Sequence, residues 1–423
     1  MDVNFLLKGI DCNCGKPHLC NIKEVNIGKN AIESLTSICK NFKSPLIVAD
    51  ENTFKAAGTQ TESALKGKDI KKAIFSGESV LIPNEQAVLF VEENLYNVDV
   101  IVGVGSGVIQ DLCKYVAHQN HLPYLVVATA PSMDGYASNG AAMIMNGMKI
   151  TYNSTLPIAI VADTLVLKNA PLDMIKAGYG DIIGKYSALN DWKLSHIING
   201  EYFCKKIYDL TYSQIQNTLS LSDKLLERNE QAVKTLMEAL VVVGILMSFV
   251  GSSRPASGSE HHLSHFFEIT GIIDGTEYFS HGVDVAFSTV VTAEIREKIL
   301  NMRNFGAISS ISTETRDSLL NKIYKDVAKS CLKLQEKAGF YAFDRSKIYK
   351  NKKSEIISVL KEMPQKEEII NMLAAVELDI NDFYSFYGQE KINNAKLFAK
   401  DLKDRFSILW LYYDFLGELN EQA

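Results

Sequence analysis

The sequence lacks an apolar run long enough to cross a lipid bilayer. Its longest run, from Ala239 to Val250, is about half of the roughly 20 residues that a membrane-spanning helix requires. The first residues, MDVNFLLKGIDCNC, contain only a short apolar stretch and do not form a secretory signal pattern. We therefore expect a cytoplasmic chain with no membrane partner, in which Ala239–Val250 belongs to a buried core helix.

An excess of positive charge is missing as well. The formal net charge is −6 and the pI is about 5.8, so the chain has no diffuse positive field to attract a phosphate backbone, and nucleic acid is not an expected partner. The sequence also contains no internal repeats, low-complexity tracts or long flexible linkers. With 423 residues, of which 47% are hydrophobic, it is long enough for two domains that each have a core.

A disulfide framework is not expected, because the seven cysteines are odd in number and spread over a large chain. The exception is a local group near the N-terminus, where Cys12, Cys14, His18 and Cys20 are close enough in sequence to ligate zinc. Their spacing, Cys-x-Cys-x3-His-x-Cys, is not a standard structural-zinc pattern. A polar loop and a metal site both remain open for this segment.

Short apolar, β-branched runs alternate with helical patterns from Ser44 to Asp163. The runs are PLIVAD, KAIF, DVIVGVG, YLVVAT and IAIVAD, and the helical patterns include NEQAVLFVEENLYN and VIQDLCKYVAH. This alternation predicts parallel strands joined by crossover helices. Because the runs are continuously apolar, we expect strands that are buried on both faces.

The pattern changes after Ala170-Pro171, where β-like runs become rare and amphipathic stretches dominate. Three such stretches are Gln231–Val250, Thr313–Lys337 and Lys396–Leu416. We predict an α/β domain at residues 1–168 and an all-helical domain at residues 169–423. The cleft between two domains is the default position for a small-molecule site.

A glycine-rich turn follows the strand predicted at residues 100–105. Gly103, Gly105 and Gly107 would let the backbone approach a pyrophosphate, whose charge is favoured at the N-terminus of the next helix. The spacing is G-x-G-x-G rather than G-x-G-x-x-G, so a plain tight turn remains an alternative.

Asp50, at the end of an earlier strand, could bind a ribose hydroxyl, which would favour NAD over NADP, or could cap the helix that follows. The hydroxyl groups of Thr129-Ala-Pro-Ser132 could contact the nicotinamide or its ribose, or close a turn.

Three of the eight histidines lie in one run, GSEHHLSHFFE at residues 258–268. His261 and His265 are four residues apart, so a helix would place them on one face. Two other segments, GDIIG at 180–184 and SHGVD at 280–284, contain Asp181 and His281. Two imidazoles and one carboxylate suit a divalent cation with open coordination positions. Spacing alone does not pair ligands so far apart.

Five ordered blocks carry a resemblance to a known family. They are GSGVIQD at 105–111, TAPSMDGYAS at 129–138, GDIIGKYSALNDW at 180–192, SRPASGSEHHLSH at 253–265 and SHGVDV at 280–285. Together they resemble the iron-containing alcohol dehydrogenases, glycerol dehydrogenases and dehydroquinate synthases, and within that superfamily the glycerol-1-phosphate dehydrogenases. The resemblance implies a Rossmann-like N-terminal domain, a helical C-terminal domain and an active site in the interdomain cleft.

The resemblance also implies roles for individual residues. A divalent ion, zinc, nickel or iron, would be held by Asp181, His261 and His281. His262 is left out, because on a helix it would point about 100° away from His261. Asp134 and His265 would face the substrate and manage its proton, although Asp134 could instead be a turn carboxylate. The implied contacts to NAD or NADP are Gly105, Ser106, Gly107, Val108, Ile109, Gln110, Asp111, Thr129, Ala130, Pro131, Ser132 and Ser138.

The reaction that the resemblance implies is the reversible reduction of dihydroxyacetone phosphate to sn-glycerol 1-phosphate, by an enzyme that forms a homo-oligomer. Arg254 and Lys185 could bind the phosphate, or could be solvated or paired within the fold. Three alternatives remain: a glycerol or other polyol dehydrogenase, a dehydroquinate synthase-like lyase, and a non-catalytic metal-binding protein.

Overall fold

The computed structural model describes residues 3–145, 148–303, 305, 308 and 311–416. Contacts divide the chain into two compact units, residues 1–182 with 216–252 and residues 183–215 with 253–423. Two long helices, α8 (Leu172–Asn199) and α9 (Lys205–Leu219), each contribute residues to both units. The sequence domains at residues 1–168 and 169–423 stay a prediction.

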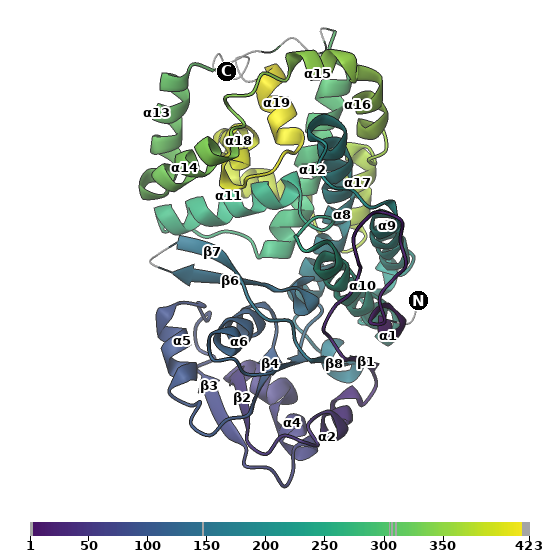
Figure 1. Cartoon of the computed structure of the whole chain (residues 1–423), viewed down its shortest axis with the longest axis vertical. Helices are drawn as coiled ribbons and strands as arrows, with labels where there is room; N and C mark the ends of the chain where they lie inside the picture. The colour runs from purple at the N-terminus through teal and green to yellow at the C-terminus, as the bar shows by residue number, and fades with distance from the viewer. Residues whose placement is uncertain (1–2, 146–147, 304, 306–307, 309–310, 417–423) are drawn as a thin grey trace. The chain divides into compact units, whose positions relative to one another are not determined.

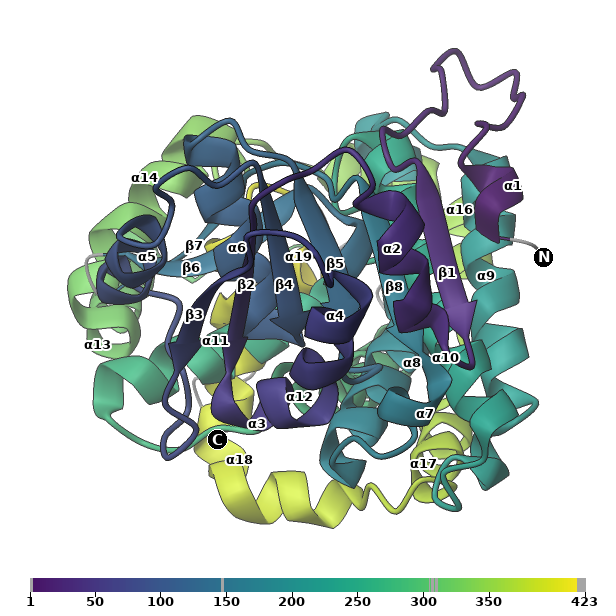
Figure 2. The ribbon, with the colours of Figure 1, turned by 90° about the horizontal axis from the view of Figure 1, so that it is seen from below.

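The first unit contains a sheet of six strands. They are β1 (Glu24–Gly28), β2 (Pro45–Asp50), β3 (Lys71–Phe75), β4 (Val100–Gly105), β5 (Tyr124–Ala128) and β8 (Ala159–Asp163). Their spatial order is β1-β8-β5-β4-β2-β3, and all neighbouring pairs are parallel (Figure 2). The predicted parallel sheet is confirmed, and five of the strands are the five predicted runs. The edge strand β1 was missed, because only one of its residues is buried and its sequence EVNIG lacks a continuous apolar run.

A second, two-stranded antiparallel sheet consists of β6 (Gly140–Met145) and β7 (Met148–Asn153). The helices of the first unit are α1 (Val3–Leu6), η1 (Ala31–Ser34), α2 (Leu35–Ile38), α3 (Glu51–Thr53), η2 (Phe54–Gly58), α4 (Thr59–Ala64), α5 (Glu85–Glu92), α6 (Gly107–Gln119), η3 (Gly135–Ala137), α7 (Thr164–Leu167), η4 (Ser222–Lys224) and α10 (Glu230–Val250). Figure 1 labels most of these elements.

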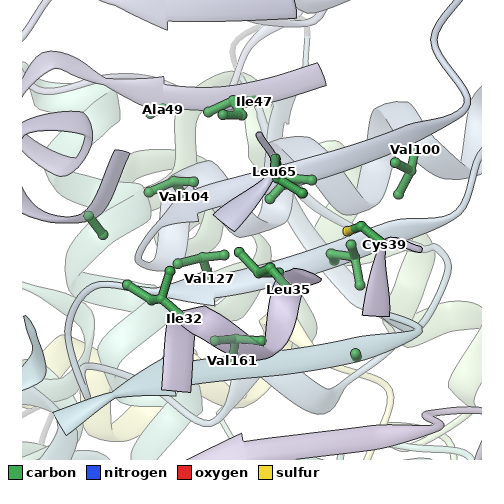
Figure 3. Close-up of a cluster of buried hydrophobic side chains, with 14 of the residues drawn as sticks. Ile32, Leu35, Cys39, Ile47, Ala49, Leu65, Val100, Val104, Val127 and Val161 are labelled. Atoms are coloured by element: carbon green, nitrogen blue, oxygen red, sulfur yellow. The ribbon is translucent and has the colours of Figure 1, made fainter. Parts of the chain in front are cut away.

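Both faces of the six-stranded sheet are covered by helices. On one face Ile47 and Val104 pack with Leu35 of α2 and with Leu65, which follows α4, in a buried cluster (Figure 3). On the other face a side chain at Gly103 would meet Gln110 and Cys113 of α6. Coverage of both faces explains why the central strands are apolar along their whole length.

Helix α10 contains the predicted core run Ala239–Val250, and most of its side chains are buried. In the described part of the chain it is the one helix that is long and apolar enough to cross a membrane. Of its most apolar window, however, 72% is buried, which is typical of a core helix. The prediction of a buried core helix is therefore confirmed.

The second unit is helical in its described residues. Besides its parts of α8 and α9, its helices are α11 (Ser259–Asp274), α12 (His281–Leu300), α13 (Thr313–Tyr324), η5 (Lys325–Val327), α14 (Ala328–Ala338), α15 (Ser346–Asn351), α16 (Lys353–Leu360), α17 (Lys366–Ala374), α18 (Ile380–Phe398), η6 (Ala399–Leu402) and α19 (Ile408–Leu416). The predicted fold class, an α/β part followed by a helical part, is confirmed.

Two predicted helices are interrupted. The stretch Thr313–Lys337 forms α13 and α14 with η5 between them, because Lys325 has a positive φ of 45°. The stretch Lys396–Leu416 is not one helix either, since Lys403 is extended before α19 begins. The side-chain amide of Gln335 donates hydrogen bonds to the carbonyl oxygens of Lys400, Asp401 and Lys403. These carbonyl groups are thus satisfied without continuing the helix.

Two helical glycines allow a close approach by the loop after β5. A Cβ at Gly178 of α8 would lie 1.8 Å from the carbonyl oxygen of Pro131, and one at Gly244 of α10 would lie 2.7 Å from that of Asp134. Both contacts involve backbone atoms, which move less easily than the end of a side chain. The loop at 131–134 therefore lies so close to α8 and α10 that only glycine fits at positions 178 and 244.

We expect Gly178→Ala to lower the free energy of unfolding by about 1–3 kcal/mol, because the added methyl group overpacks a rigid contact. Urea denaturation followed by circular dichroism measures this. The matched control is Gly28→Ala, where a Cβ would meet no atom within 4 Å. Equal stabilities for the two variants would contradict this account of the Gly178 contact.

Candidate metal and dinucleotide site

The three predicted metal ligands lie together in the structure. One ligand atom from each of Asp181, His261 and His281 lies within 4.8 Å of the other two. Asp181 is fully buried in α8, His261 lies in the first turn of α11, and His281 begins α12. One carboxylate and two imidazoles form a donor set that suits zinc, iron or nickel and leaves coordination positions open.

Glycines explain how α8 comes so close to the other two helices. A Cβ at Gly184, about one turn after Asp181, would lie 2.5 Å from a methyl carbon of Val285 and 3.4 Å from Cγ of Glu260. A Cβ at Gly258 would lie 2.8 Å from Cα of Ala188. Larger side chains at these positions would push α8 away from α11 and α12.

A buried carboxylate orients one of the histidines. Oε1 of Glu260 lies 2.7 Å from Nδ1 of His261 and also accepts a hydrogen bond of 2.8 Å from the backbone N–H of Gly258. Burial raises the pKa of Glu260, but the bonds from His261 and Gly258 outweigh it and hold this pKa below its usual value. Because Nδ1 donates to Glu260, Nε2 is the nitrogen left to bind a metal.

A second buried carboxylate fixes the beginning of α11. Asp191 of α8 accepts a hydrogen bond of 2.6 Å from the backbone N–H of Ser259, and one of 2.9 Å from that of Ile408. Arg296 of α12 donates to the same carboxylate at 2.8 Å, and both side chains are buried. Sequence reasoning missed this pair and the role of Glu260. The only available signal was that Glu260 immediately precedes His261.

The other two histidines of the predicted cluster are not members of the ligand group. The ring of His265 is half-buried and stacks on that of His281, with 5.7 Å between centroids. His262 is fully buried, and neither of its ring nitrogens has a hydrogen-bond partner among the described residues. Burial, and then the charges of Arg405 and Lys403, keep the pKa of His262 well below its usual value, so the ring is neutral.

The loop that carries Asp134 is tied to Asp181, one of the predicted metal ligands. The backbone N–H of Asp134 donates a hydrogen bond of 2.9 Å to Oδ2 of Asp181. Lys114 of α6 donates to the carbonyl oxygens of Gly135 and Gly140, at 2.9 and 2.6 Å, and Ser138 Oγ donates to Gly135 at 3.2 Å. Asp134 therefore lies beside a predicted ligand.

The predicted dinucleotide loop joins β4 to α6, with Ser106 as the N-cap of the helix. The buried amide of Gln110 points back into the turn, where it donates to the carbonyl oxygens of Gly103 and Gly105 at 2.9 and 3.0 Å. Oε1 of Gln110 accepts a hydrogen bond from the Tyr124 hydroxyl. Gln110 thus supports the loop from its buried side. The N–H groups in the first turn of α6 have no partner within the helix, so they are the donors that would bind an anion.

The remaining predicted cofactor contacts make bonds within the fold. Asp50 caps α3 by accepting a hydrogen bond of 2.8 Å from the backbone N–H of Thr53, the alternative noted for this residue. In the segment 129–132, the hydroxyl of Tyr136 donates to the carbonyl oxygen of Ala130 at 2.5 Å and lies 3.4 Å from Ser132 Oγ. A cofactor role for these residues stays a prediction.

Sequence comparisons identify the family. Residues 26–171 match the family described as iron-containing alcohol dehydrogenase. A glycerol-1-phosphate dehydrogenase (NAD(P)+) of Halalkalibacterium halodurans is 35% identical over 323 residues, which cover 72% of this chain and 81% of that protein. The chain belongs to the glycerol-1-phosphate dehydrogenase family. A further member, from Bacillus licheniformis, is 30% identical over 74% of this chain and 79% of its own length.

Solved structures show that the fold extends beyond this family. Glycerol dehydrogenase from Schizosaccharomyces pombe superposes with a TM-score of 0.54 at 18% identity, covering 86% of this chain and 91% of that one. An iron-containing alcohol dehydrogenase from Thermococcus thioreducens gives a TM-score of 0.59 at 13% identity, covering 92% and 97%. At such low identity these two likenesses concern the fold alone.

The two residues considered for the phosphate of a glycerol-phosphate substrate are both buried. Arg254 forms two hydrogen bonds of 2.9 Å with the carboxylate of Glu201 and donates to the carbonyl oxygen of Phe406 at 2.7 Å. Arg254 is therefore paired within the fold, which was one of the alternatives to phosphate binding. Lys185 is fully buried in α8, and its part in phosphate binding stays a prediction.

We expect Glu260→Gln to weaken metal binding about 10–100-fold, because it replaces the carboxylate that holds the His261 ring and its tautomer. Competition for the bound metal with a chromophoric chelator measures the affinity. The control is Glu277→Gln, which removes an exposed carboxylate from the loop between α11 and α12. Parental affinity in the Glu260 variant would contradict the positioning role.

Proposed function

We propose that this chain is a metal-dependent, NAD(P)-linked dehydrogenase that interconverts dihydroxyacetone phosphate and sn-glycerol 1-phosphate. The observation that carries the proposal is the convergence of Asp181, His261 and His281 in a member of the glycerol-1-phosphate dehydrogenase family. The relatives that bear this name are aligned over most of their own length, which supports a shared activity.

Asp181, His261 and His281 would hold one divalent ion, and the geometry of their side chains fits that task. Their ligand atoms are within 4.8 Å of one another, and Glu260 leaves Nε2 of His261 for coordination. When bound, the ion supplies a Lewis acid that polarises the substrate carbonyl. Zinc, nickel and iron all accept these donors, so a divalent ion of this group fits the site.

The turn after β4 and the first turn of α6 would hold the pyrophosphate of NAD or NADP, with helix N–H groups as donors. When bound, the nicotinamide supplies or accepts the hydride. In the reductive direction the hydride goes to the carbonyl carbon and a proton goes to the carbonyl oxygen.

His265 and Asp134 are the groups that we assign to the substrate. His265 is half-buried beside His281, and a ring nitrogen there would deliver the proton. Asp134 is fixed through its backbone N–H to Asp181, so its side chain would orient the substrate hydroxyl groups. A homo-oligomeric state and a cytoplasmic location are expectations from the sequence that belong to the same proposal.

We expect His261→Ala to lose the bound metal and turnover together, because two remaining donors hold a divalent ion poorly. Metal analysis of the purified chain and the rate of NADH oxidation measure the two losses. His118→Ala, which removes an exposed imidazole at the end of α6, is the control and should keep both. Stoichiometric metal in the His261 variant would rule out the proposed ligand set.

We expect NADH or NADPH oxidation to proceed with dihydroxyacetone phosphate and to be much slower with dihydroxyacetone, because the phosphate supplies binding energy that the unphosphorylated ketone lacks. Initial rates with both substrates and both cofactors, at equal enzyme concentration, measure the preference. A faster reaction with dihydroxyacetone would move the function to a polyol dehydrogenase.

A further inference from the structure

A second group of potential metal ligands includes part of the N-terminal segment. It consists of Cys12, Cys14, His18 and Cys204, and one ligand atom from each lies within 4.8 Å of the others. Sγ of Cys14 and Nε2 of His18 are 3.1 Å apart. None of the seven cysteines, all of which lie in the described residues, forms a disulfide in the structure, so no disulfide accounts for the convergence of these thiols.

The backbone of the N-terminal loop is shaped to bring its three ligands together. The backbone N–H of Ile10 donates a hydrogen bond of 3.3 Å to the carbonyl oxygen of His18, which closes the loop. Gly15, between Cys14 and His18, has a φ of +86°, a conformation that side chains larger than glycine rarely adopt. The turn at Gly15 sends the chain back, so that His18 returns to the two cysteines.

The surrounding structure holds this loop at both ends. The side-chain amide of Asn4 exchanges two hydrogen bonds, of 2.8 and 3.0 Å, with the backbone of Val25 in β1. The buried ring of His18 lies 5.8 Å from that of Phe249 in α10, centroid to centroid. The ligands on the loop are therefore placed by secondary structure and not by the loop alone.

The fourth ligand is equally fixed. Cys204 is fully buried and directly precedes α9, where its carbonyl oxygen accepts a hydrogen bond of 3.0 Å from the N–H of Tyr208. Two residues earlier, the carbonyl oxygen of Tyr202 accepts a hydrogen bond of 2.6 Å from the indole N–H of Trp192. A thiol on such a rigid segment is suited to a site of defined geometry.

We propose that Cys12, Cys14, His18 and Cys204 bind one zinc ion at a site distinct from Asp181, His261 and His281. Three thiolates and one imidazole make a complete tetrahedral set, which is typical of structural zinc sites. Thiolates also select zinc over magnesium, calcium and manganese. Because all four positions are taken by the protein, this zinc has no place for substrate and stabilises the fold around the N-terminal loop.

The structure changes one member of the zinc-ligand group that the sequence suggested. Cys20 was included there because it is close in sequence, but it does not belong to the group of converging ligand atoms, and Cys204 does. The resulting pattern, Cys-x-Cys-x3-His followed by a distant cysteine, has no local signature. Only the fold brings its last ligand near.

The test uses the full-length chain, purified with zinc under reducing conditions. Elemental mass spectrometry measures the number of zinc ions per chain. We expect two zinc ions in the parent, one in Cys14→Ser and in Cys204→Ser, and one in His261→Ala. Cys20→Ser is the matched control, because it removes a thiol from the same segment and should leave both ions bound.

Cobalt substitution separates the two sites in the same proteins. Sulfur-to-cobalt charge-transfer absorption is expected in the parent and in His261→Ala, and should be lost in Cys14→Ser. A result in which His261→Ala keeps its full zinc content contradicts the proposed active site and leaves this one standing. The two proposals can therefore fail independently.

A third measurement needs no variant that could misfold. Zinc removal from the parent with a chelator should make Cys12 and Cys14 react faster with an alkylating reagent, as located by peptide mass, while Cys20 changes little. The proposal is overturned if Cys14→Ser keeps the parental zinc content and cobalt spectrum, if Cys20→Ser loses as much zinc, or if chelation leaves Cys12 and Cys14 unchanged.

Discussion

The beginning of α11 rests on the buried carboxylate of Asp191, and much of the candidate site depends on that contact. Asp191 accepts the backbone N–H of Ser259 and the guanidinium of Arg296, so one carboxylate joins α8, α11 and α12. Burying an ion pair costs desolvation free energy, and good geometry with further hydrogen bonds offsets it. The pair is thus better understood as fixing the orientation of three helices than as a source of net stability.

Orientation matters because each of these helices carries one of the three predicted metal ligands. Gly184 and Gly258 let the helices approach, and Glu260 then sets the tautomer of His261. Buried side chains have a similar supporting role in the first unit, where Gln110 and Lys114 donate hydrogen bonds to the predicted cofactor turn and to the loop of Asp134. Side chains that would never touch a substrate hold the ones assigned to it.

Periodicity and composition predicted the elements with strong patterns. The central strands are buried on both faces and most side chains of α10 are buried, and such elements carry long apolar runs, so their sequences were informative. The edge strand β1 has one buried residue and gave no such signal. The break between α18 and α19 was also missed; its carbonyl oxygens accept hydrogen bonds from Gln335, which is far away in the chain and gives no local signal.

The sequence by itself determined the fold class and the family, and it predicted Asp181, His261 and His281 as metal ligands, since ordered blocks of residues carry that information without coordinates. Only the tertiary structure decided which side chains meet. It paired Arg254 with Glu201, placed Glu260 on His261, and replaced Cys20 by Cys204 in the thiol group. The physical reason is that hydrogen bonds and metal sites depend on distances in space, which spacing along a chain does not set for residues on different elements.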